Sequence, residues 1–214
     1  MNNLIAPEIV NDDFALALES TVANFPVKAI LELGASSGDG STACFMRGMH
    51  QNTEAKLFSL EASKERFAAL QQRYAGRARI ACINAFSVPR EQWLSHAQID
   101  LYVHQYGNEF GSATYKQWLQ MEIDYQQQSG VPCNGIEQAV ALNGGPFDFV
   151  LIDSSLFSGD AEFKAVYGAS FIALDDVRSM KTGPSLKELS ADPHYRLFAH
   201  GHARYGWAIF QKVI

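Results

Sequence analysis

The sequence of 214 residues has few cysteines, fewer basic than acidic residues and no long hydrophobic run. Its three cysteines, Cys44, Cys82 and Cys133, are too far apart in the chain to form a metal-binding pair, so we interpret them as reduced thiols of a cytosolic protein. Lys and Arg number 17 against 23 Asp and Glu, and the formal charge is -6. Nucleic-acid binding depends on clustered basic residues, so this balance argues against a nucleic-acid partner.

Signals for membranes or secretion are also missing from the sequence. The first residues lack the basic start and apolar run of a secretory signal, and no apolar stretch is long enough to cross a bilayer. There is no internal repeat and no low-complexity tract. We therefore expect a cytoplasmic protein with no membrane partner, and the length is sufficient for a single domain over residues 1–214.

What the sequence does contain is an alternation of strand-like and helix-like segments. Short apolar runs bounded by turn residues are typical of strands buried on both faces of a parallel sheet. Such runs occupy 27–34, 55–61, 77–85, 147–155 and 170–176, and helical patterns occupy 12–25, 41–50, 63–76, 161–168 and 184–191. This order predicts an α/β fold with a parallel sheet, and the strand-like runs 195–201 and 205–214 predict a closing hairpin.

The alternation is interrupted between residues 86 and 146. This segment is irregular and rich in Gln, Tyr and Gly, with helical pieces such as 115–128. Because ordinary connections are much shorter, we interpret 86–146 as an insertion or lid.

The loop in LELGASSGDGST, residues 31–42, is compatible with more than one chemistry. GASSGDG resembles the phosphate loop of NAD(P)-binding short-chain dehydrogenases, but those enzymes need a Tyr and a Lys four positions apart on one helix. None of the eight tyrosines has a Lys at that spacing. Gly-x-Ser-x-Gly is also the nucleophile elbow of α/β-hydrolases, with Ser36 as nucleophile, but that fold places several strands before the elbow and only about thirty residues precede it here.

From ILELGASSGDGST to its C-terminus, the chain resembles the class I S-adenosylmethionine-dependent methyltransferases. The resemblance implies a Rossmann-like, doubly wound, mostly parallel sheet of seven strands, with an antiparallel strand in the C-terminal hairpin. It also implies a donor site at the carboxyl ends of the strands. The glycine-rich loop would cradle the aminocarboxypropyl group, an acid after the second strand would accept the ribose hydroxyls, and residues after the third strand would meet the adenine. On this chain the implied donor-binding residues are Glu32, Gly34, Ala35, Ser36, Gly38, Glu61, Asn84, Ala85 and Asp153. The loop departs from the usual Gly-x-Gly-x-Gly at Ser36.

The resemblance is strongest in FDFVLIDSSLFSGDAEF and SFIALDDVRSMK, which look like a subgroup of small-molecule methyltransferases. Asp153, Asp175 and Asp176 follow two of the predicted strands and offer oxygen ligands suited to Mg²⁺. Catechol-type and macrocin-type O-methyltransferases use acids in this manner, and a metal there would lower the pKa of an acceptor hydroxyl. We therefore predict O-methylation, with Mg²⁺ as a possible aid. Each of the three acids can alternatively cap a helix.

The acceptor is predicted to be a small molecule. The segment 101–118 mixes aromatic, amide and His side chains, and we take His104 as the candidate base beside Asp153. His200, His202 and Tyr205 form a second polar group at the closing hairpin. A protein that binds the donor without transferring a methyl group stays an alternative, and a homodimer is one of the open oligomeric states.

Overall fold

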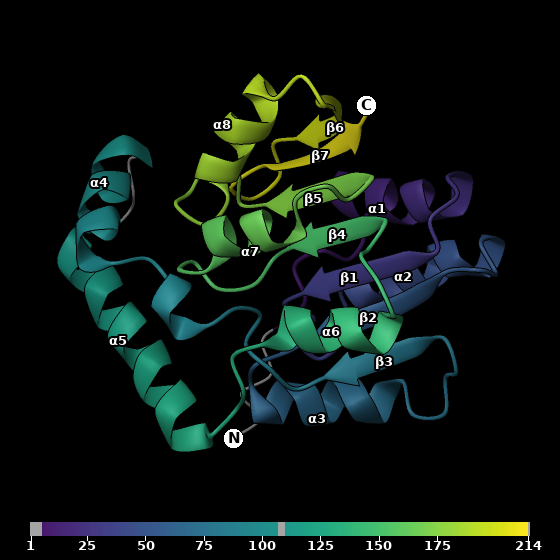
Figure 1. Cartoon of the computed structure of the whole chain (residues 1–214), viewed down its shortest axis with the longest axis horizontal. Helices are drawn as coiled ribbons and strands as arrows, with labels where there is room; N and C mark the ends of the chain where they lie inside the picture. The colour runs from purple at the N-terminus through teal and green to yellow at the C-terminus, as the bar shows by residue number, and fades with distance from the viewer. Residues whose placement is uncertain (1–5, 107–109, 214) are drawn as a thin grey trace.

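The computed structural model describes residues 6–106 and 110–213. Its centre is a seven-stranded sheet in the order β3-β2-β1-β4-β5-β7-β6 (Figure 1). The first five strands of the chain run parallel, whereas β7 is antiparallel to both β5 and β6. The predicted fold class, a mostly parallel sheet with an antiparallel strand in a C-terminal hairpin, is confirmed.

All seven strands lie within the segments predicted from the sequence. Every residue of β1, β4 and β5 is buried, which explains why these segments are apolar apart from Glu32 and Asp175 and do not alternate. The strands are β1 (Ala29–Leu33), β2 (Lys56–Leu60), β3 (Ile80–Ile83), β4 (Phe149–Ile152), β5 (Phe171–Asp175), β6 (Tyr195–Gly201) and β7 (Trp207–Lys212).

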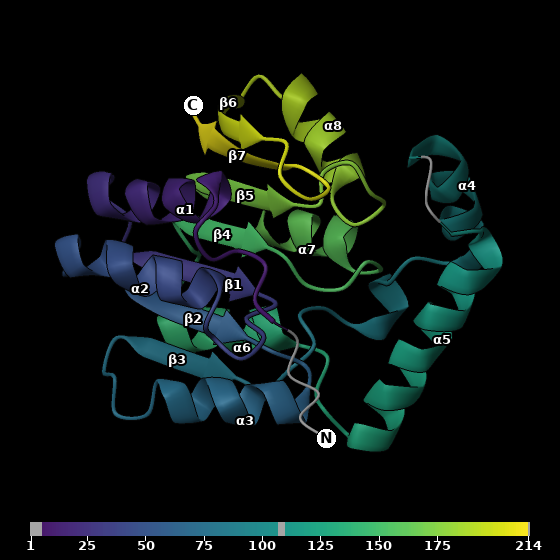
Figure 2. The ribbon, with the colours of Figure 1, turned by 180° about the vertical axis from the view of Figure 1, so that it is seen from behind.

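Helices cover both faces of the sheet. One layer contains α1 (Asp13–Asn24), α2 (Ser41–Gln51) and α3 (Lys64–Arg73), and the other contains α6 (Gly135–Asn143), α7 (Gly159–Val166) and α8 (Gly183–Ala191). Figures 1 and 2 show these layers from opposite sides. Two hydrophobic clusters, one on each side of the sheet, form the core.

The insertion predicted over 86–146 is more regular than the sequence indicates. It contains a 3-10 turn, η1 (Arg90–Gln92), and the helices α4 (His96–Tyr106), α5 (Ser112–Ser129) and α6. The last of these covers the sheet between β3 and β4, whereas α4 and α5 stand at the carboxyl ends of the parallel strands (Figure 1). Both helices have weak apolar patterns, since α4 buries Ile99 and α5 buries Tyr115 and Leu119. Residues 107–109 of the predicted insertion lie outside the described residues.

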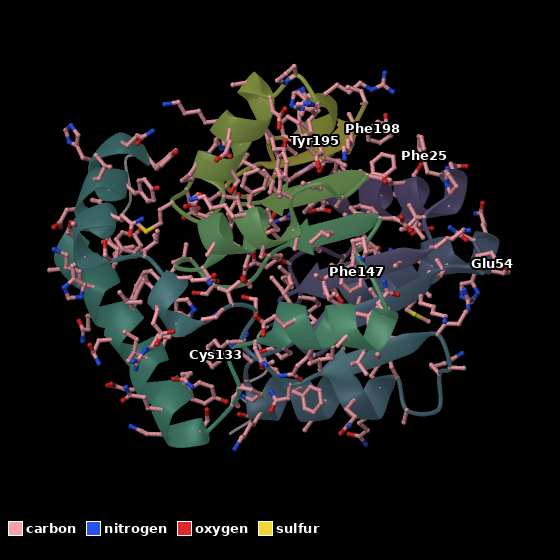
Figure 3. All side chains as sticks on the ribbon, viewed as in Figure 1. Phe25, Glu54, Cys133, Phe147, Tyr195 and Phe198 are labelled. Carbon is pink, nitrogen blue, oxygen red and sulfur yellow. The ribbon has the colours of Figure 1, made fainter. Side chains whose placement is uncertain are left out.

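The sequence argues against a membrane-spanning helix and favours reduced cysteines. Within residues 6–106 and 110–213, no helix combines the length and the hydropathy needed to cross a bilayer. The three cysteines are free thiols. Figure 3 shows one of them, Cys133, on the segment between α5 and α6.

Aromatic side chains join α1 to the closing hairpin at the amino ends of the strands. Phe25 follows α1, and its ring lies 5.0 Å from that of Phe171 and 5.4 Å from that of Phe198. Figure 3 shows the Phe25 and Phe198 rings side by side at the end of the sheet opposite α5. This packing stabilises one end of the sheet and leaves its carboxyl end to the loops.

Candidate active site

A cavity of about 870 Å³ opens at the carboxyl ends of the parallel strands. Its walls come from the loops after β1, β2, β3, β4 and β5, from α5, and from residues 6–9. Open α/β sheets bind ligands at this edge, and the volume is within the range of small-molecule sites. The cavity is therefore the candidate active site.

Gly34 begins the loop after β1 and lies against the loop after β4. Its φ of +94° is in the region that favours glycine, and a Cβ there would lie 2.7 Å from the Asp153 carbonyl carbon and 2.9 Å from the Ser154 Cα. Ser36 also has a positive φ, +50°, and its backbone N–H donates to Glu61 Oε2 at 2.8 Å. The loop is thus held by both neighbouring strand ends.

Gly38, the last glycine of the predicted donor loop, packs away from the cavity. A Cβ at this residue would lie 2.6 Å from Leu70 Cδ1 and 2.7 Å from Tyr74 Cε2. Its carbonyl oxygen accepts a hydrogen bond from the Tyr74 hydroxyl at 2.6 Å. Gly38 therefore brings the loop close to α3, whereas Gly34, Ala35 and Ser36 line the cavity.

Glu32 is fully buried beneath this loop and does not line the cavity. Its carboxylate accepts hydrogen bonds from the hydroxyls of Ser41 at 2.6 Å, Thr42 at 2.8 Å and Ser59 at 2.6 Å. Burial raises the pKa of Glu32, and the three hydroxyls oppose that shift. The structure thus gives Glu32 a positioning role between β1, β2 and the first turn of α2.

Glu61 lines the cavity at the end of β2. Besides the bond from Ser36, its carboxylate accepts one from the Ser63 backbone N–H at 2.7 Å, and Arg66 Nε lies 3.9 Å away. Asn84 lies outside the lining: its amide donates to the carbonyl oxygens of Glu61 at 2.8 Å and Ala62 at 3.2 Å. Next to it, Ala85 lies on the cavity wall.

The structure brings the three predicted metal ligands together. One carboxylate oxygen from each of Asp153, Asp175 and Asp176 lies within 4.8 Å of the others. However, Lys181 lies among them, with its Nζ 2.5 Å from Asp153 Oδ1, 3.1 Å from Asp176 Oδ2 and 3.9 Å from Asp175 Oδ2.

Lys181 is buried, with 5% of its side chain exposed. Burial alone would lower the pKa of Lys181, but the three carboxylates outweigh it and raise the pKa above the usual value, so the ammonium stays charged. Arg204 adds a second cation, with Nη2 3.0 Å from Asp175 Oδ1. The acids are thus already paired with cations, and the residues do not fit Mg²⁺ while Lys181 is in place. Lys181 is the last residue of SFIALDDVRSMK, and nothing in that local pattern indicates its place among the acids.

Helix α5 supplies a wall of the cavity that includes Glu122, a residue that the sequence analysis did not single out. Glu122 lines the cavity and accepts a hydrogen bond from the Ser155 hydroxyl at 2.6 Å. Burial raises the pKa of Glu122 to about 7, although the bond from Ser155 opposes the shift. One turn later, the Tyr125 hydroxyl accepts from the Lys64 backbone N–H at 2.9 Å. These contacts place this part of α5 over the ends of β2 and β4.

A second buried carboxylate lies beneath the cavity floor. Glu162, on α7, accepts hydrogen bonds from the hydroxyls of Ser87, Ser154 and Ser158, the last at 2.9 Å. Burial raises the pKa of Glu162, and the three hydroxyls oppose that shift. Because Ser87 follows β3 and the other two follow β4, Glu162 fixes two loops of the cavity relative to each other. A pattern of isolated serines gave no signal for this cluster.

The predicted base His104 does not lie in the cavity. It is near the end of α4 with an exposed side chain, and it is absent from the cavity wall. The rings of His200 and His202 lie 5.8 Å apart near the β6–β7 turn and are likewise absent from the wall. The segment 101–118 was predicted to line the acceptor site. Trp118, at its end, does line the cavity, but His104, on α4, does not.

Comparisons with known proteins identify the fold. The chain matches no protein-family model, and no curated protein is significantly similar to it in sequence. Solved structures are similar over almost the whole chain. The O-methyltransferase from Bacillus cereus in complex with SAH aligns with 99% of this chain and 85% of its own length, at a TM-score of 0.61 and 16% identity.

Two further structures give the same result. Cofactor-bound Rv0187 from MTB aligns with 99% of this chain and 84% of its own, at a TM-score of 0.59 and 14% identity. The SAH-bound methyltransferase PaMTH1 from Podospora anserina aligns with 94% of this chain and 78% of its own, at a TM-score of 0.51 and 17% identity. At these identities the likeness establishes the fold, which is that of the methyltransferases.

Proposed function

We propose that this protein is an S-adenosylmethionine-dependent methyltransferase that transfers the methyl group to a hydroxyl of a small molecule. The observation that supports it most is the cavity at the carboxyl edge of a methyltransferase-like sheet, where the Gly34–Ser36 loop is hydrogen-bonded to Glu61. An all-parallel sheet in the order 3-2-1-4-5-6 is usual for dinucleotide-binding domains. Here an antiparallel β7 separates β5 from β6, which disfavours the dehydrogenase alternative.

The donor would lie across the ends of β1, β2 and β3. In this proposal the backbone of Gly34, Ala35 and Ser36 contacts the aminocarboxypropyl group. When the donor binds, one carboxylate oxygen of Glu61 turns away from the loop and accepts hydrogen bonds from the ribose hydroxyls. The adenine would lie near Ala85, with Glu122 facing it from α5. Gly38, Glu32 and Asn84 would act indirectly, by holding the loop and the strand ends in place.

The acceptor would lie over the ends of β4 and β5, on the side of the cavity that Asp153 and Lys181 line. Methyl transfer is an in-line displacement at an activated sulfonium, so alignment of the acceptor oxygen supplies much of the catalysis. Asp153 borders both the Gly34 loop and the acceptor side, and we propose that it orients the acceptor hydroxyl. We give His104 no catalytic role, and Mg²⁺ takes no part in the proposed reaction because Lys181 pairs with its expected ligands.

We further propose that residues 1–214 act as one domain, with α4 and α5 covering the cavity as a lid. A lid would exclude water from the reacting methyl group. A cytoplasmic location, a homodimer and the absence of a nucleic-acid partner stay predictions.

Thermal unfolding with added ligands tests the proposed cofactor. S-Adenosylmethionine and S-adenosylhomocysteine, each at a hundredfold excess over the dissociation constant, should stabilise the protein by about 2.7 kcal/mol and raise Tm by a few degrees. NADH and NADPH serve as controls and should leave Tm unchanged. Stabilisation by a dinucleotide alone would reject the proposal in favour of the dehydrogenase.

A second measurement separates an enzyme from a protein that only binds the donor. Purified protein and radiolabelled donor are incubated with a panel of hydroxylated sugars, phenols and amino compounds. Methylation of a hydroxyl compound is the expected result. Tight donor binding with no turnover on any acceptor would favour the non-catalytic alternative.

A further inference from the structure

We propose that the Lys181 ammonium is the built-in cation of this site, in the place of a divalent metal, and that it binds the acceptor oxygen directly. The proposal concerns the same cavity as the proposed function and rests on that function for the role toward the acceptor. The exclusion of a metal rests on the geometry of the acidic cluster alone.

The positions of the charged atoms leave no room for both cations. Mg²⁺ binds oxygen ligands at about 2.0–2.1 Å in an octahedral arrangement. Lys181 Nζ already lies between the carboxylates, at 2.5 Å from Asp153 Oδ1 and 3.1 Å from Asp176 Oδ2. A metal that used these oxygens would have to displace a charged side chain that is 5% exposed.

The backbone at Lys181 is held in place by contacts with neighbouring segments. Thr182 Oγ1 donates to the Asp175 carbonyl oxygen at 2.5 Å, and the Lys181 backbone N–H donates to Ser179 Oγ at 3.1 Å. On the opposite side, the Gly159 backbone lies so close that a Cβ there would come within 2.9 Å of the Lys181 carbonyl carbon. Helix α7 therefore begins with a glycine where Lys181 packs against it.

The acidic cluster already has two cationic partners. Asp153 and Asp176 contact the Lys181 ammonium, and Asp175 pairs with Arg204. Loss of the Lys181 ammonium would leave two buried or half-buried carboxylates without a cation. The empty space between them would then match the place of a divalent ion.

Lys181 has a hydrogen-bond donor left for the acceptor. An ammonium group has three N–H donors. Among the described residues, Asp153 and Asp176 accept one each, and Asp175 Oδ2 is too distant at 3.9 Å. Because Lys181 lines the cavity, the third N–H is available to an acceptor oxygen. Its charge stabilises the negative charge that develops on that oxygen when the hydroxyl proton passes to Asp153; the oxygen then bonds to the donor methyl group as the bond from that methyl to sulfur breaks and the thioether leaves. The substrate class is a small molecule with a hydroxyl group.

A metal-binding experiment tests this inference without an assay of activity. Wild-type protein, Lys181→Ala, Lys181→Arg and the control Lys164→Ala are titrated with Mn²⁺ by calorimetry and heated with Mn²⁺, Mg²⁺ or EDTA. The control removes an exposed lysine that pairs with Asp160 at 2.7 Å on α7. We expect that the wild type, Lys181→Arg and the control show no Mn²⁺ binding and that their Tm is the same with Mn²⁺, Mg²⁺ or EDTA. Lys181→Ala should bind Mn²⁺ at least tenfold more tightly than wild type and lose that binding when Asp176→Asn is added.

Two results would overturn the inference. One is Mn²⁺ binding by the wild type that Asp176→Asn abolishes, and the other is a folded Lys181→Ala protein with no gain in Mn²⁺ affinity. If Lys181→Ala fails to fold, the wild-type titration decides by itself. Binding of S-adenosylhomocysteine is measured on the same wild-type sample, so a failure of the proposed cofactor is distinguishable from a failure at the cation site.

Discussion

Gly34 shows how a single residue can be required by its backbone contacts alone. Its positive φ disfavours any side chain, and the Asp153 and Ser154 backbones occupy the space where a Cβ would point. The glycine therefore permits the loop after β1 to touch the loop after β4. The close approach explains the glycine without reference to any ligand.

A pair of glycine variants separates the cost of the positive φ from the cost of the close backbone contact. Gly76 has φ +74°, and a Cβ there would meet no atom of the described residues within 4 Å. Gly76→Ala should cost about 1 kcal/mol of unfolding free energy, from the backbone conformation alone. Gly34→Ala should cost about 3 kcal/mol, because overlap with backbone atoms adds to that conformational cost. Urea denaturation followed by circular dichroism measures both; equal losses would show that the contact with the β4 loop is unimportant.

Glu122 makes stability depend on pH. Burial raises its pKa to about 7, so the folded protein holds a proton that the unfolded chain releases at about pH 4.3. The resulting stabilisation is complete below the unfolded pKa and is lost as the pH rises through 7. Relative to Glu122→Gln, the wild type should therefore lose about 2 kcal/mol of unfolding free energy between pH 5 and pH 8.

The measurement for Glu122 is urea unfolding of both proteins at several pH values. The Gln variant is the control, because its amide keeps an oxygen that can accept the bond from Ser155 and does not ionise. A difference in unfolding free energy between the two proteins that stays constant from pH 5 to pH 8 would contradict the raised pKa of Glu122.

At the scale of elements, Glu162 connects α7 to two loops of the cavity. Three serine hydroxyls donate to one of its oxygens, and the other oxygen is buried with no hydrogen-bond partner among the described residues. Such a cluster holds the ends of β3 and β4 at a fixed separation. The loops that contact the proposed adenine and acceptor are therefore positioned by one helix.

Removal of this carboxylate should be more costly than its neutralisation. Glu162→Ala leaves three hydroxyls without their acceptor and should reduce the unfolding free energy by about 3 kcal/mol. Glu162→Gln keeps an acceptor oxygen of the same shape and should cost about 1 kcal/mol. Chemical denaturation of the two variants tests this order, and the reverse order would exclude the hydroxyl cluster as the source of stability.

At the scale of the whole molecule, Arg204 connects the two ends of the chain. It lies in the β6–β7 turn, donates to Asp12 just before α1, and pairs with Asp175 at the end of β5. Residues 6–9 line the cavity, so the same arginine also steadies the segment that leads to them. The aromatic packing of Phe25 and Phe198 joins α1 to the hairpin at the opposite end of the sheet.

Loss of Arg204 should therefore affect both stability and ligand binding. Arg204→Met leaves the buried Asp175 with fewer cationic partners and should cost about 2 kcal/mol of unfolding free energy. Arg196→Met is the control, because Arg196 is exposed on β6 and its guanidinium donates to the Gln211 side-chain oxygen on the neighbouring strand. The control should change stability by less than about 0.5 kcal/mol. Thermal unfolding with and without S-adenosylhomocysteine measures the loss of stability and the loss of ligand binding. Equal Tm values and equal ligand-induced shifts for the two variants would contradict the role of Arg204.

The strands, most of the helices and the edge of the sheet where the cavity lies can be predicted from local sequence patterns. Strands buried on both faces are mostly apolar, and helices that cover them need a repeating apolar face, so local patterns reveal both. The pattern predicts a helical piece over 115–128, within α5, but no helix at α4, because both helices bury few side chains and carry little of that pattern.

The pairing of the polar residues, in contrast, could not be predicted before the fold was known. Asp153, Asp175 and Asp176 looked like metal ligands in the sequence, but the fold carries Lys181 into the space between them. His104 has suitable chemistry and lies away from the cavity, whereas Glu122 and Glu162 carried no recognisable motif and lie at its wall and beneath its floor. The physical reason is that charge pairing and burial depend on distances between segments far apart in the chain, which no local pattern contains.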